Sequence, residues 1–364
     1  FLFLVSLYTF NANRILSLLL IGLLSVIYWR HLWQHKIITL VIVIIGLLMV
    51  TPLIPHLRSP EGKLRWNEVN IFSNLDIIIN SNTQIAADSG GRLAKLSHHR
   101  YLGHARNFLH HYFDHFSGRY LFLQGDANPR LSLQDVGELY LLELPFLLAG
   151  IYTLIKMRNR TTGLLIGWIL LAPIPAAMAR ETPHALRTVS MLPVPQILIA
   201  LGLWYSFTIL LRRKIWPIGY TLLAIGSFLY FQYSYYHYYP RDYAGEWLTG
   251  YPKLVEYLKT SPEVQSAQTI TVVPDYGRPY IYFLFYNQYD PARYANQVDR
   301  TGDAFGFFNV HGFDKYHFER IDPQFIKTGD IYVVRGSETL DGFLLISTIS
   351  DINGYPQFNV LKKT

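Results

Sequence analysis

Two long apolar runs, residues 161–179 and 189–211, constrain this chain most, and the charged turn 180–187 separates them. Each run is long enough to cross the roughly 30 Å hydrocarbon layer of a bilayer as a helix. Both carry a pair of prolines on the side nearest the turn, and broken helices are tolerated in a membrane where they line a protein-walled cavity. The pattern predicts a cationic turn that caps a cavity at one membrane face. An ordinary polar loop whose arginines anchor at the headgroups is the alternative.

Further apolar stretches extend this pattern towards both ends of the chain. Short loops between them are rich in Lys and Arg, which mark the cytoplasmic side, and all of them assign the same face. We therefore predict an α-helical polytopic membrane protein with a transmembrane bundle over residues 1–239 and an extracytoplasmic loop at 56–138. The predicted spans are 1–10, 15–29, 37–53, 139–155, 161–179, 189–211 and 215–233.

Composition supports an alternation of membrane-like and soluble-like segments. Hydrophobic residues make up 51% of the 364, yet the mean hydropathy is only +0.17. The absence of cysteine excludes disulfides and thiolate metal sites. The net charge of +7 is spread without a long basic run, which favours contact with a membrane over nucleic acid. Because the chain opens inside an apolar run, we expect an N-terminal part upstream of residue 1.

Within the segment 56–138, residues 93–116 repeat apolar and aromatic side chains at helical spacing. This repeat predicts a helix that lies on the membrane surface. His111 and His115 are four residues apart and could share a metal ion. No Glu lies between them and no third ligand is evident, so an amphipathic helix with interfacial histidines is the better interpretation. No cofactor is certain, and a divalent cation is left open.

The loop that follows is dense in turn residues and charge. Asp126, Asn128 and Arg130 could hold a polar headgroup together, or they could make an Asx-type turn closed by an Arg and Asp pair. Glu143 then falls one turn inside the predicted span 139–155. A carboxylate at that depth needs a partner, either a cation from a neighbouring helix or a substrate group.

Residues 240–364 have the pattern of a small extracytoplasmic α/β domain. Helices are predicted at 252–259 and 278–289, and strands at 269–273, 330–334, 343–349 and 357–361. The segment holds neither a Gly-x-Ser-x-Gly motif nor a phosphate-binding loop. The sequence therefore assigns no catalytic motif to this domain.

The charged turn is suited to holding a phosphate. Guanidinium groups make bidentate, permanently charged contacts with phosphate, and a histidine adds a donor or a proton. In glycosyl transfer from a lipid-phosphate sugar, fixed cations stabilise the phosphate as it departs, and a carboxylate takes the proton of the acceptor hydroxyl. No outward-facing carboxylate of this sequence has a compelling claim to be that base.

Short motifs lie in order along nearly the whole chain, at residues 6–14, 59–62, 70–73, 115–117, 125–130, 143–146, 183–187, 277–283, 285–286 and 290–291. Together they resemble bacterial membrane glycosyltransferases of the GT-C superfamily, similar to glycosyltransferase family 39, the dolichyl-phosphate-mannose-protein mannosyltransferase type. Each motif alone is weakly specific, and their order carries the resemblance.

The resemblance implies an enzyme of the cell membrane that moves a sugar from a polyprenyl-phosphate carrier to a hydroxyl of a glycan, lipid or protein. The transfer is inverting and occurs on the extracytoplasmic face. The catalytic acidic residue of such enzymes lies in the first outward loop, which is expected upstream of residue 1. His184 and Arg187 are the candidate contacts to the carrier phosphate, with Arg180, Arg14 and Arg130 as weaker ones. Headgroup or sugar contacts are expected among Asp126, Asn128, Glu143 and Glu181.

Two other classes of function stay open. A flippase or transporter of a lipid-linked substrate would favour ionisable residues near the middle of the bilayer. Here the charges gather at the outer ends of the predicted spans, and only Glu143 enters one. A non-catalytic membrane protein whose C-terminal domain binds a glycan is the other alternative, and it predicts that Arg187 can be neutralised without loss of function.

Overall fold

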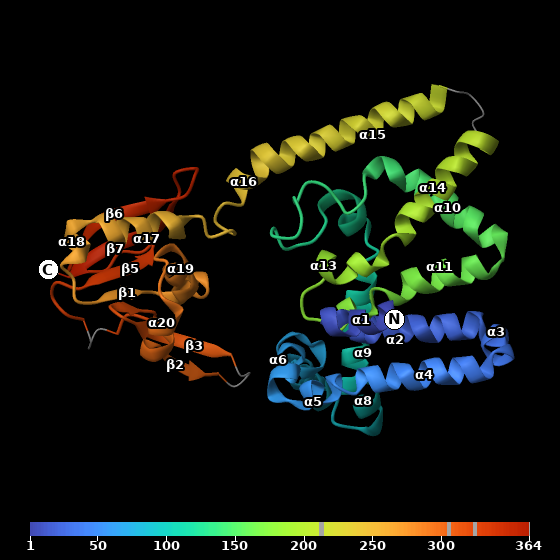
Figure 1. The fold of residues 1–364 in the computed structure, drawn as a ribbon, viewed down its shortest axis with the longest axis horizontal. Helices are drawn as coiled ribbons and strands as arrows, with labels where there is room; N and C mark the ends of the chain where they lie inside the picture. Colours follow the sequence, from blue (N-terminus) through green and yellow to red (C-terminus); the bar gives the residue numbers. More distant parts are fainter. Residues whose placement is uncertain (211–214, 304–306, 323–325, 364) are drawn as a thin grey trace. The chain divides into compact units, whose positions relative to one another are not determined.

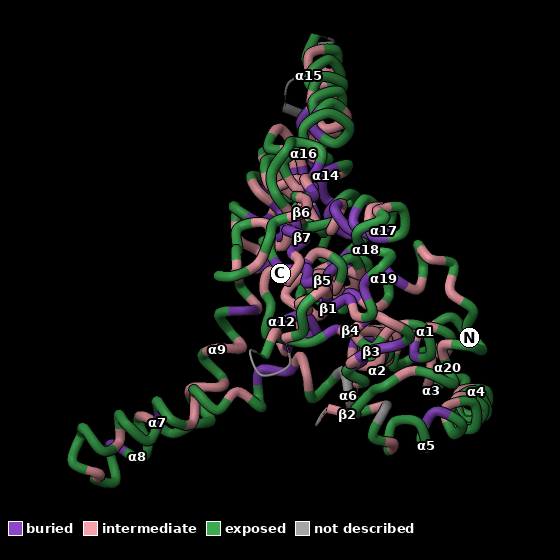
Figure 2. The backbone as a smooth tube through the Cα atoms, turned by 90° about the vertical axis from the view of Figure 1, so that its left-hand side faces the viewer, coloured by how far each residue is buried: buried purple, intermediate pink, exposed green. Residues whose placement is uncertain are grey.

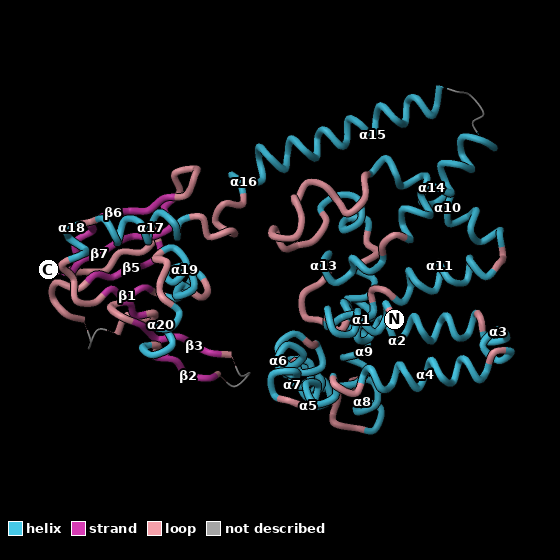
Figure 3. Tube along the Cα trace, in the orientation of Figure 1, coloured by secondary structure: helices cyan, strands magenta, loops and turns pink. Residues whose placement is uncertain are grey.

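The structure is a computed structural model that describes residues 1–210, 215–303, 307–322 and 326–363. The chain divides into two compact units, Phe1–Gln232 (unit 1) and Tyr233–Thr364 (unit 2). Unit 1 is built from helices, whereas the described strands lie in unit 2 (Figures 1 and 3). The boundary predicted between residues 239 and 240 lies a short way inside unit 2.

Unit 1 consists of helices joined by turns and by one longer loop at residues 125–140. Its α-helices are α1 (Leu2–Thr9), α2 (Asn11–Ile27), α3 (Trp29–Gln34), α4 (Lys36–Val50), α5 (Leu53–Arg58), α6 (Pro60–Val69), α7 (Leu75–Ala87), α8 (Arg92–Ser97), α9 (Arg100–Asp114), α10 (Leu144–Met157), α11 (Arg160–Leu171), α12 (Ile174–Ala177), α13 (Ala185–Thr188), α14 (Val194–Tyr205) and α15 (Ile215–Tyr233). Single turns of 3₁₀ or π helix lie at Ile71–Ser73, Arg119–Gln124, Leu141–Glu143, Val189–Met191 and Ser206–Leu210.

The prediction of a polytopic transmembrane bundle is wrong. Among the described residues, one helical stretch, Arg160–Ala177, is long and apolar enough to cross a membrane. The helices Ala185–Met191 and Val194–Thr208 pass the same test only as a pair, and they are bent by 55°. Multi-pass localisation is therefore unsupported, and the structure provides one membrane-spanning candidate, or two if the bent pair is a single span.

For three of the predicted spans the physical reason is helix length. The predicted spans 15–29, 37–53 and 139–155 correspond to α2, α4 and α10, which have 17, 15 and 14 residues. At a rise of about 1.5 Å per residue they reach at most about 26 Å, short of the roughly 30 Å that a span needs. Apolar composition identified helices at these places, but it overstated the length of α4 and α10 and displaced the ends of α2.

The closest helix pair of unit 1 is formed by α10 and α14. A Cβ atom on Gly150 would lie 1.8 Å from the Leu198 carbonyl oxygen, and one on Gly202 would lie 1.7 Å from the Phe146 carbonyl oxygen. Only glycine permits this backbone approach. The pair belongs to a buried cluster that includes Leu154. A second, smaller cluster joins α2 to the start of the turn after α11.

Unit 2 contains a seven-stranded sheet in its described residues, in the order β2-β3-β4-β1-β5-β7-β6. The central strand β1 pairs in parallel with β4 and β5, and the other pairs are antiparallel. The strands are β1 (Ile270–Val272), β2 (Asp299–Gly302), β3 (Phe308–Phe313), β4 (Tyr316–His317), β5 (Ile331–Arg335), β6 (Phe343–Ser350) and β7 (Pro356–Lys363). The helices are α16 (Tyr239–Asp242), α17 (Gly250–Thr260), α18 (Pro262–Gln265), α19 (Pro279–Tyr286) and α20 (Pro291–Gln297).

The sheet of unit 2 is covered on both faces. Alternate residues of β5 point to opposite sides: Ile331 and Val333 join the main core with α17 and α19, while Tyr332 and Val334 join a smaller cluster. The predicted helices at 252–259 and 278–289 and the predicted strands of this unit are confirmed, with ends displaced by a few residues. Because β5 is buried on both faces, its sequence is a short continuous apolar run rather than an alternating pattern.

Candidate functional site

A cavity of about 400 Å³ opens in unit 1 between α2, α6 and the turn before α13. Its described lining includes the basic side chains Arg14, Lys63 and Arg187, together with His184, and contains no acidic residue. The rest of the lining is largely apolar, with Phe10, Ile15, Leu57, Trp66, Met178 and Leu186 among its members. A largely apolar cavity that is also lined by cations fits an amphiphile with an anionic head.

Helix starts place two of the basic side chains. Arg14 lies in the first turn of α2, where its Nε donates to the Leu7 carbonyl at 3.2 Å. Lys63 lies in the first turn of α6, whose N-terminus is capped by Ser59 through a 3.2 Å hydrogen bond from the Gly62 amide. A Cβ atom on Gly62 would lie 1.9 Å from the His56 carbonyl oxygen, so glycine is required where α5 and α6 meet.

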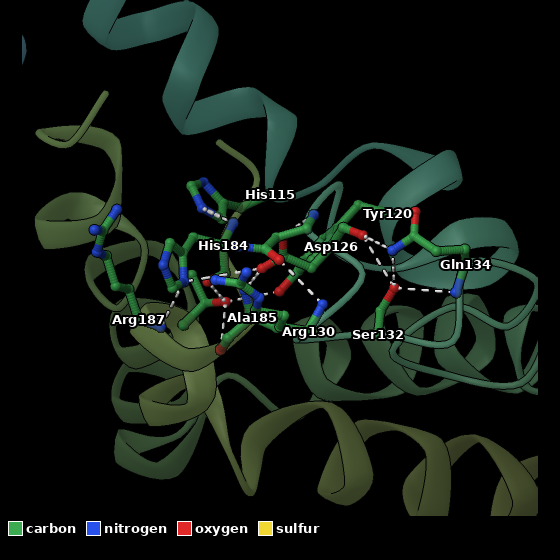
Figure 4. A network of polar contacts seen from close by, with 11 residues as sticks. His115, Tyr120, Asp126, Arg130, Ser132, Gln134, His184, Ala185 and Arg187 are labelled. Carbon is green, nitrogen blue, oxygen red and sulfur yellow. Dashed lines mark hydrogen bonds and ion pairs between the residues drawn. The ribbon is translucent and has the colours of Figure 1, made fainter. Parts of the chain in front are cut away.

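His184 caps α13 and brings Arg187 to the cavity. The Arg187 amide donates to His184 Nδ1 at 3.4 Å, and the Ala185 amide donates to Asp126 Oδ2 at 2.7 Å (Figure 4). The other Asp126 oxygen accepts from the Asn128 amide at 2.8 Å. The buried Asp126 carboxylate therefore fastens the loop 125–130 to the charged turn, and both of its oxygens hold backbone amides.

Three histidines link α9 to this turn. His111 Nδ1 lies 2.9 Å from the Ala179 carbonyl oxygen, and His115 Nδ1 lies 2.8 Å from the His111 carbonyl oxygen. His115 Nε2 accepts the His184 amide at 3.2 Å, so its proton is on Nδ1 and the ring is neutral. Burial lowers the pKa of His115 to about 4. The described residues contain no cluster of three or more metal-ligating side chains.

His184 itself contributes a hydrogen bond rather than a fixed charge. Burial, and then the neighbouring Arg187, lower the pKa of its imidazole, while the Asp126 carboxylate at 3.9 Å opposes the shift. The fixed positive charge of the cavity therefore comes from Arg14, Lys63 and Arg187.

Two arginines predicted as weaker phosphate contacts lie outside the described lining of the cavity. Arg180 is exposed, and its guanidinium donates to the Asn70 carbonyl at 3.3 Å and to Ser73 Oγ at 3.2 Å. Arg130 is exposed, and its amide donates to Asn128 Oδ1 at 3.0 Å. Arg180 thus joins the turn to the segment after α6, and Arg130 belongs to the Asx-type turn.

The acidic candidates also have local roles. Glu143 Oε2 accepts the Tyr140 amide at 2.9 Å, so this carboxylate finds its partner in the backbone at a helix start. Glu181 is exposed in the turn and is absent from the described lining. Neither side chain is brought to the cavity with His184 and Arg187.

Sequence reasoning missed two residues near this site. Lys63 was not singled out, although it directly follows the motif at 59–62. Glu138 accepts a hydrogen bond from the Asp126 backbone, and the surrounding protein, followed by the Asp126 carboxylate, raises its pKa to about 7 although its surface is exposed. No sequence pattern marks Glu138, because a loop without periodic structure sets its neighbours.

Comparison with protein families, with curated proteins and with solved structures finds no match to this chain.

Proposed function

We propose that this protein is a glycosyltransferase that takes a sugar from a polyprenyl-phosphate carrier and passes it, with inversion, to an acceptor hydroxyl. The observation that carries the proposal is the cavity in which Arg14, Lys63 and Arg187 gather beside an apolar wall. A polyprenyl phosphate has the matching chemistry, because a dianionic head is joined to a long apolar chain. The order of motifs along the sequence supports the same class of donor.

The position of the cavity supports a donor drawn from a membrane. Pro175, Met178 and Ala179 line it, and Pro175 belongs to the membrane-spanning candidate Arg160–Ala177 while the other two follow its end. A phosphate at the end of a span lies at the level of the lipid headgroups, where its charge stays hydrated as its chain enters the hydrocarbon. We propose that the protein is anchored in the cell membrane by this helix, with unit 2 on the extracytoplasmic side.

The described residues of the site can assist one step of the transfer, the departure of the carrier phosphate from the sugar. Charge grows on the phosphate oxygens as the sugar–oxygen bond breaks, and preorganised cations stabilise it there. Arg187 is the first choice for this role, because the α13 cap fixes its backbone and Asp126 holds the adjacent amide. Neutral His184 presents an additional hydrogen-bonding group beside it.

The proposal is tested by binding to the full chain in detergent or nanodiscs, with farnesyl phosphate as the probe. Tight binding is expected, and Arg187→Gln should weaken it about tenfold or more, since a charged hydrogen bond contributes roughly 1.5–3 kcal/mol. Arg320→Gln is the matched control, because this arginine is exposed in unit 2 and lies outside the described lining, and it should bind as the unaltered chain does. Farnesol tests the need for the phosphate.

Three outcomes separate the candidate functions. Weakened binding with Arg187→Gln, together with polyprenyl phosphate released from a sugar-loaded carrier by the full-length enzyme, supports the transferase. Carrier movement across vesicles that depends on Arg187 without sugar release favours a flippase. Equal binding of farnesol and farnesyl phosphate contradicts a phosphate site at this cavity.

A further inference from the structure

We propose that α8 and α9 form a docking surface for an anionic phospholipid bilayer. These helices, with α7, make an arm of unit 1 that is mostly exposed along its length (Figure 2). The glycosyl-transfer site does not use this arm, because none of its residues lines the cavity in the described part of the chain. The inference stands on the arm's own contacts and charges.

The inner face of α9 packs within the arm and against the rest of unit 1. Within the arm, Gly103 lies so close to α7 that a Cβ atom would be 2.8 Å from the Ile77 side chain. His111, on the same side of α9, reaches the Ala179 carbonyl oxygen at 2.9 Å. At helical spacing, the side chains at 102, 109 and 113 therefore fall on the opposite face.

That opposite face is apolar and uncovered. Leu102, Leu109 and Phe113 are 54%, 51% and 62% exposed, and on α8 Leu93 and Leu96 are 83% and 70% exposed. Large apolar side chains clustered in this way on short amphipathic helices are typical of segments that lie in a membrane interface.

The basic side chains around this apolar face favour a negatively charged partner surface. From α8 to the end of the apolar face at residue 113, the sequence carries Arg92, Lys95, Arg100 and Arg106 and no aspartate or glutamate. All of these cations are exposed, and Arg106 borders the face formed by residues 102, 109 and 113. Basic side chains flanking an apolar stripe complement the negative potential of anionic lipid.

The contacts of the arm with the rest of unit 1 fix its position relative to the membrane-spanning candidate. Tyr112 donates to the Leu170 carbonyl at 2.8 Å, and Leu170 lies in the membrane-spanning candidate Arg160–Ala177. His111 meets Ala179, directly beyond the end of that candidate. If this stretch crosses a bilayer, the arm leaves it close to the bilayer surface, where an apolar face bordered by cations meets hydrocarbon and headgroups together.

The absence of cysteine makes a direct test clean. Leu96→Cys and Leu102→Cys, each labelled with an environment-sensitive fluorophore, are examined in the full chain in nanodiscs of phosphatidylcholine alone or mixed with phosphatidylglycerol. We expect quenching by brominated acyl chains that is stronger in the anionic discs. Labels that stay equally accessible to aqueous iodide in both lipids and in detergent would show that no bilayer covers this face and would overturn the proposal.

A charge variant tests the lipid preference separately. Arg92→Gln, Lys95→Gln and Arg106→Gln combined should lower the ratio of docked to undocked arm on the order of 100-fold, at about fivefold for each cation. A triple variant in unit 2, Lys259→Gln, Arg320→Gln and Lys327→Gln, changes net charge equally and should leave docking unchanged. Quenching that is independent of phosphatidylglycerol would contradict the anionic surface, and equal losses in both triple variants would assign the effect to net charge.

Discussion

The helices of the two units differ in how their apolar side chains are used. In unit 2, α17 buries Tyr251, Leu254, Val255 and Leu258 against the sheet. In unit 1, neither α4 nor α15 has a buried residue in its described part, although both are rich in Leu and Ile. The apolar side chains of α17 thus pack in a core, whereas those of α4 and α15 meet whatever surrounds the chain. Apolar content therefore predicts burial within the chain only where the sequence also supplies a partner surface.

A core substitution in unit 2 should give the largest effect. Phe283 is fully buried and packs on Tyr316 and Phe318, with ring centroids 4.9 and 5.4 Å away. Phe283→Ala is expected to cost about 3–5 kcal/mol of unfolding free energy, because it removes apolar contacts and leaves a cavity. Hydrogen exchange of the full chain measures this loss in each unit separately, and we expect it in unit 2 alone.

Phe285→Ala provides the matched control, because Phe285 lies on the same helix and is 72% exposed. It should change the unfolding free energy by no more than about 0.5 kcal/mol. Equal losses in the two variants would show that burial in unit 2 does not determine its stability. Faster exchange in unit 1 after Phe283→Ala would show that the units do not unfold independently.

The second largest effect is expected from acid, which should lower the unfolding free energy of unit 1 through its buried histidines. The buried histidines of the described chain, His111, His115 and His184, all lie in unit 1. Because burial lowers the folded-state pKa of His115 from 6.5 to about 4, its contribution is fully present above pH 6.5 and is lost as pH falls towards 4. The shift corresponds to roughly 3 kcal/mol of unfolding free energy over that window.

The measurement is the denaturant midpoint of each unit between pH 4 and pH 7. His115→Gln keeps a donor and an acceptor without titrating, so this part of the pH dependence of unit 1 should disappear. Unit 2 serves as the internal reference within the same sample. An unchanged slope in unit 1 after His115→Gln would contradict the assignment of the acid sensitivity to this ring.

The same contrast explains how much the sequence could predict. In unit 2 the short apolar run of β5 and the helical spacing of α17 both reflect burial in the core, so both elements were located correctly. In unit 1 the apolar runs revealed helices, and prolines mark two of their boundaries: Pro52 follows the end of α4 at Val50, and Pro145 lies in the first turn of α10. The predicted spans ran past both signals because a full membrane-crossing length was assumed.

The site shows the same division. His184 and Arg187, with Arg14 as a weaker candidate, were predicted as phosphate contacts because Arg and His beside apolar runs are easy to recognise in a sequence. All three line one cavity. Arg180 and Arg130 were equally conspicuous and lie outside its described lining. Hydrogen bonds between distant segments determine which cations line the cavity. The Ala185 amide, for example, donates to the Asp126 carboxylate 59 residues away, and no local sequence pattern predicts such a contact.

Glu138 should give the smallest effect, with the opposite sign to that of His115. The surrounding protein and the Asp126 carboxylate raise its pKa to about 7, so the folded state favours its protonated form. That contribution is present below pH 4.5 and is lost as pH rises through about 7. Glu138→Gln should therefore stabilise unit 1 slightly at pH 8 relative to the unaltered chain and leave the difference near zero at pH 5. The effect is small because solvent screens an exposed carboxylate.

Denaturant midpoints of unit 1 at pH 5 and pH 8 measure the effect of Glu138→Gln. A gain in stability at pH 5 that vanishes at pH 8 would contradict the raised pKa of Glu138. Between pH 4.5 and 6.5 the contributions of Glu138 and His115 change in opposite directions, and the one from buried His115 is the larger, so these two groups together should make unit 1 more stable as pH rises over this range.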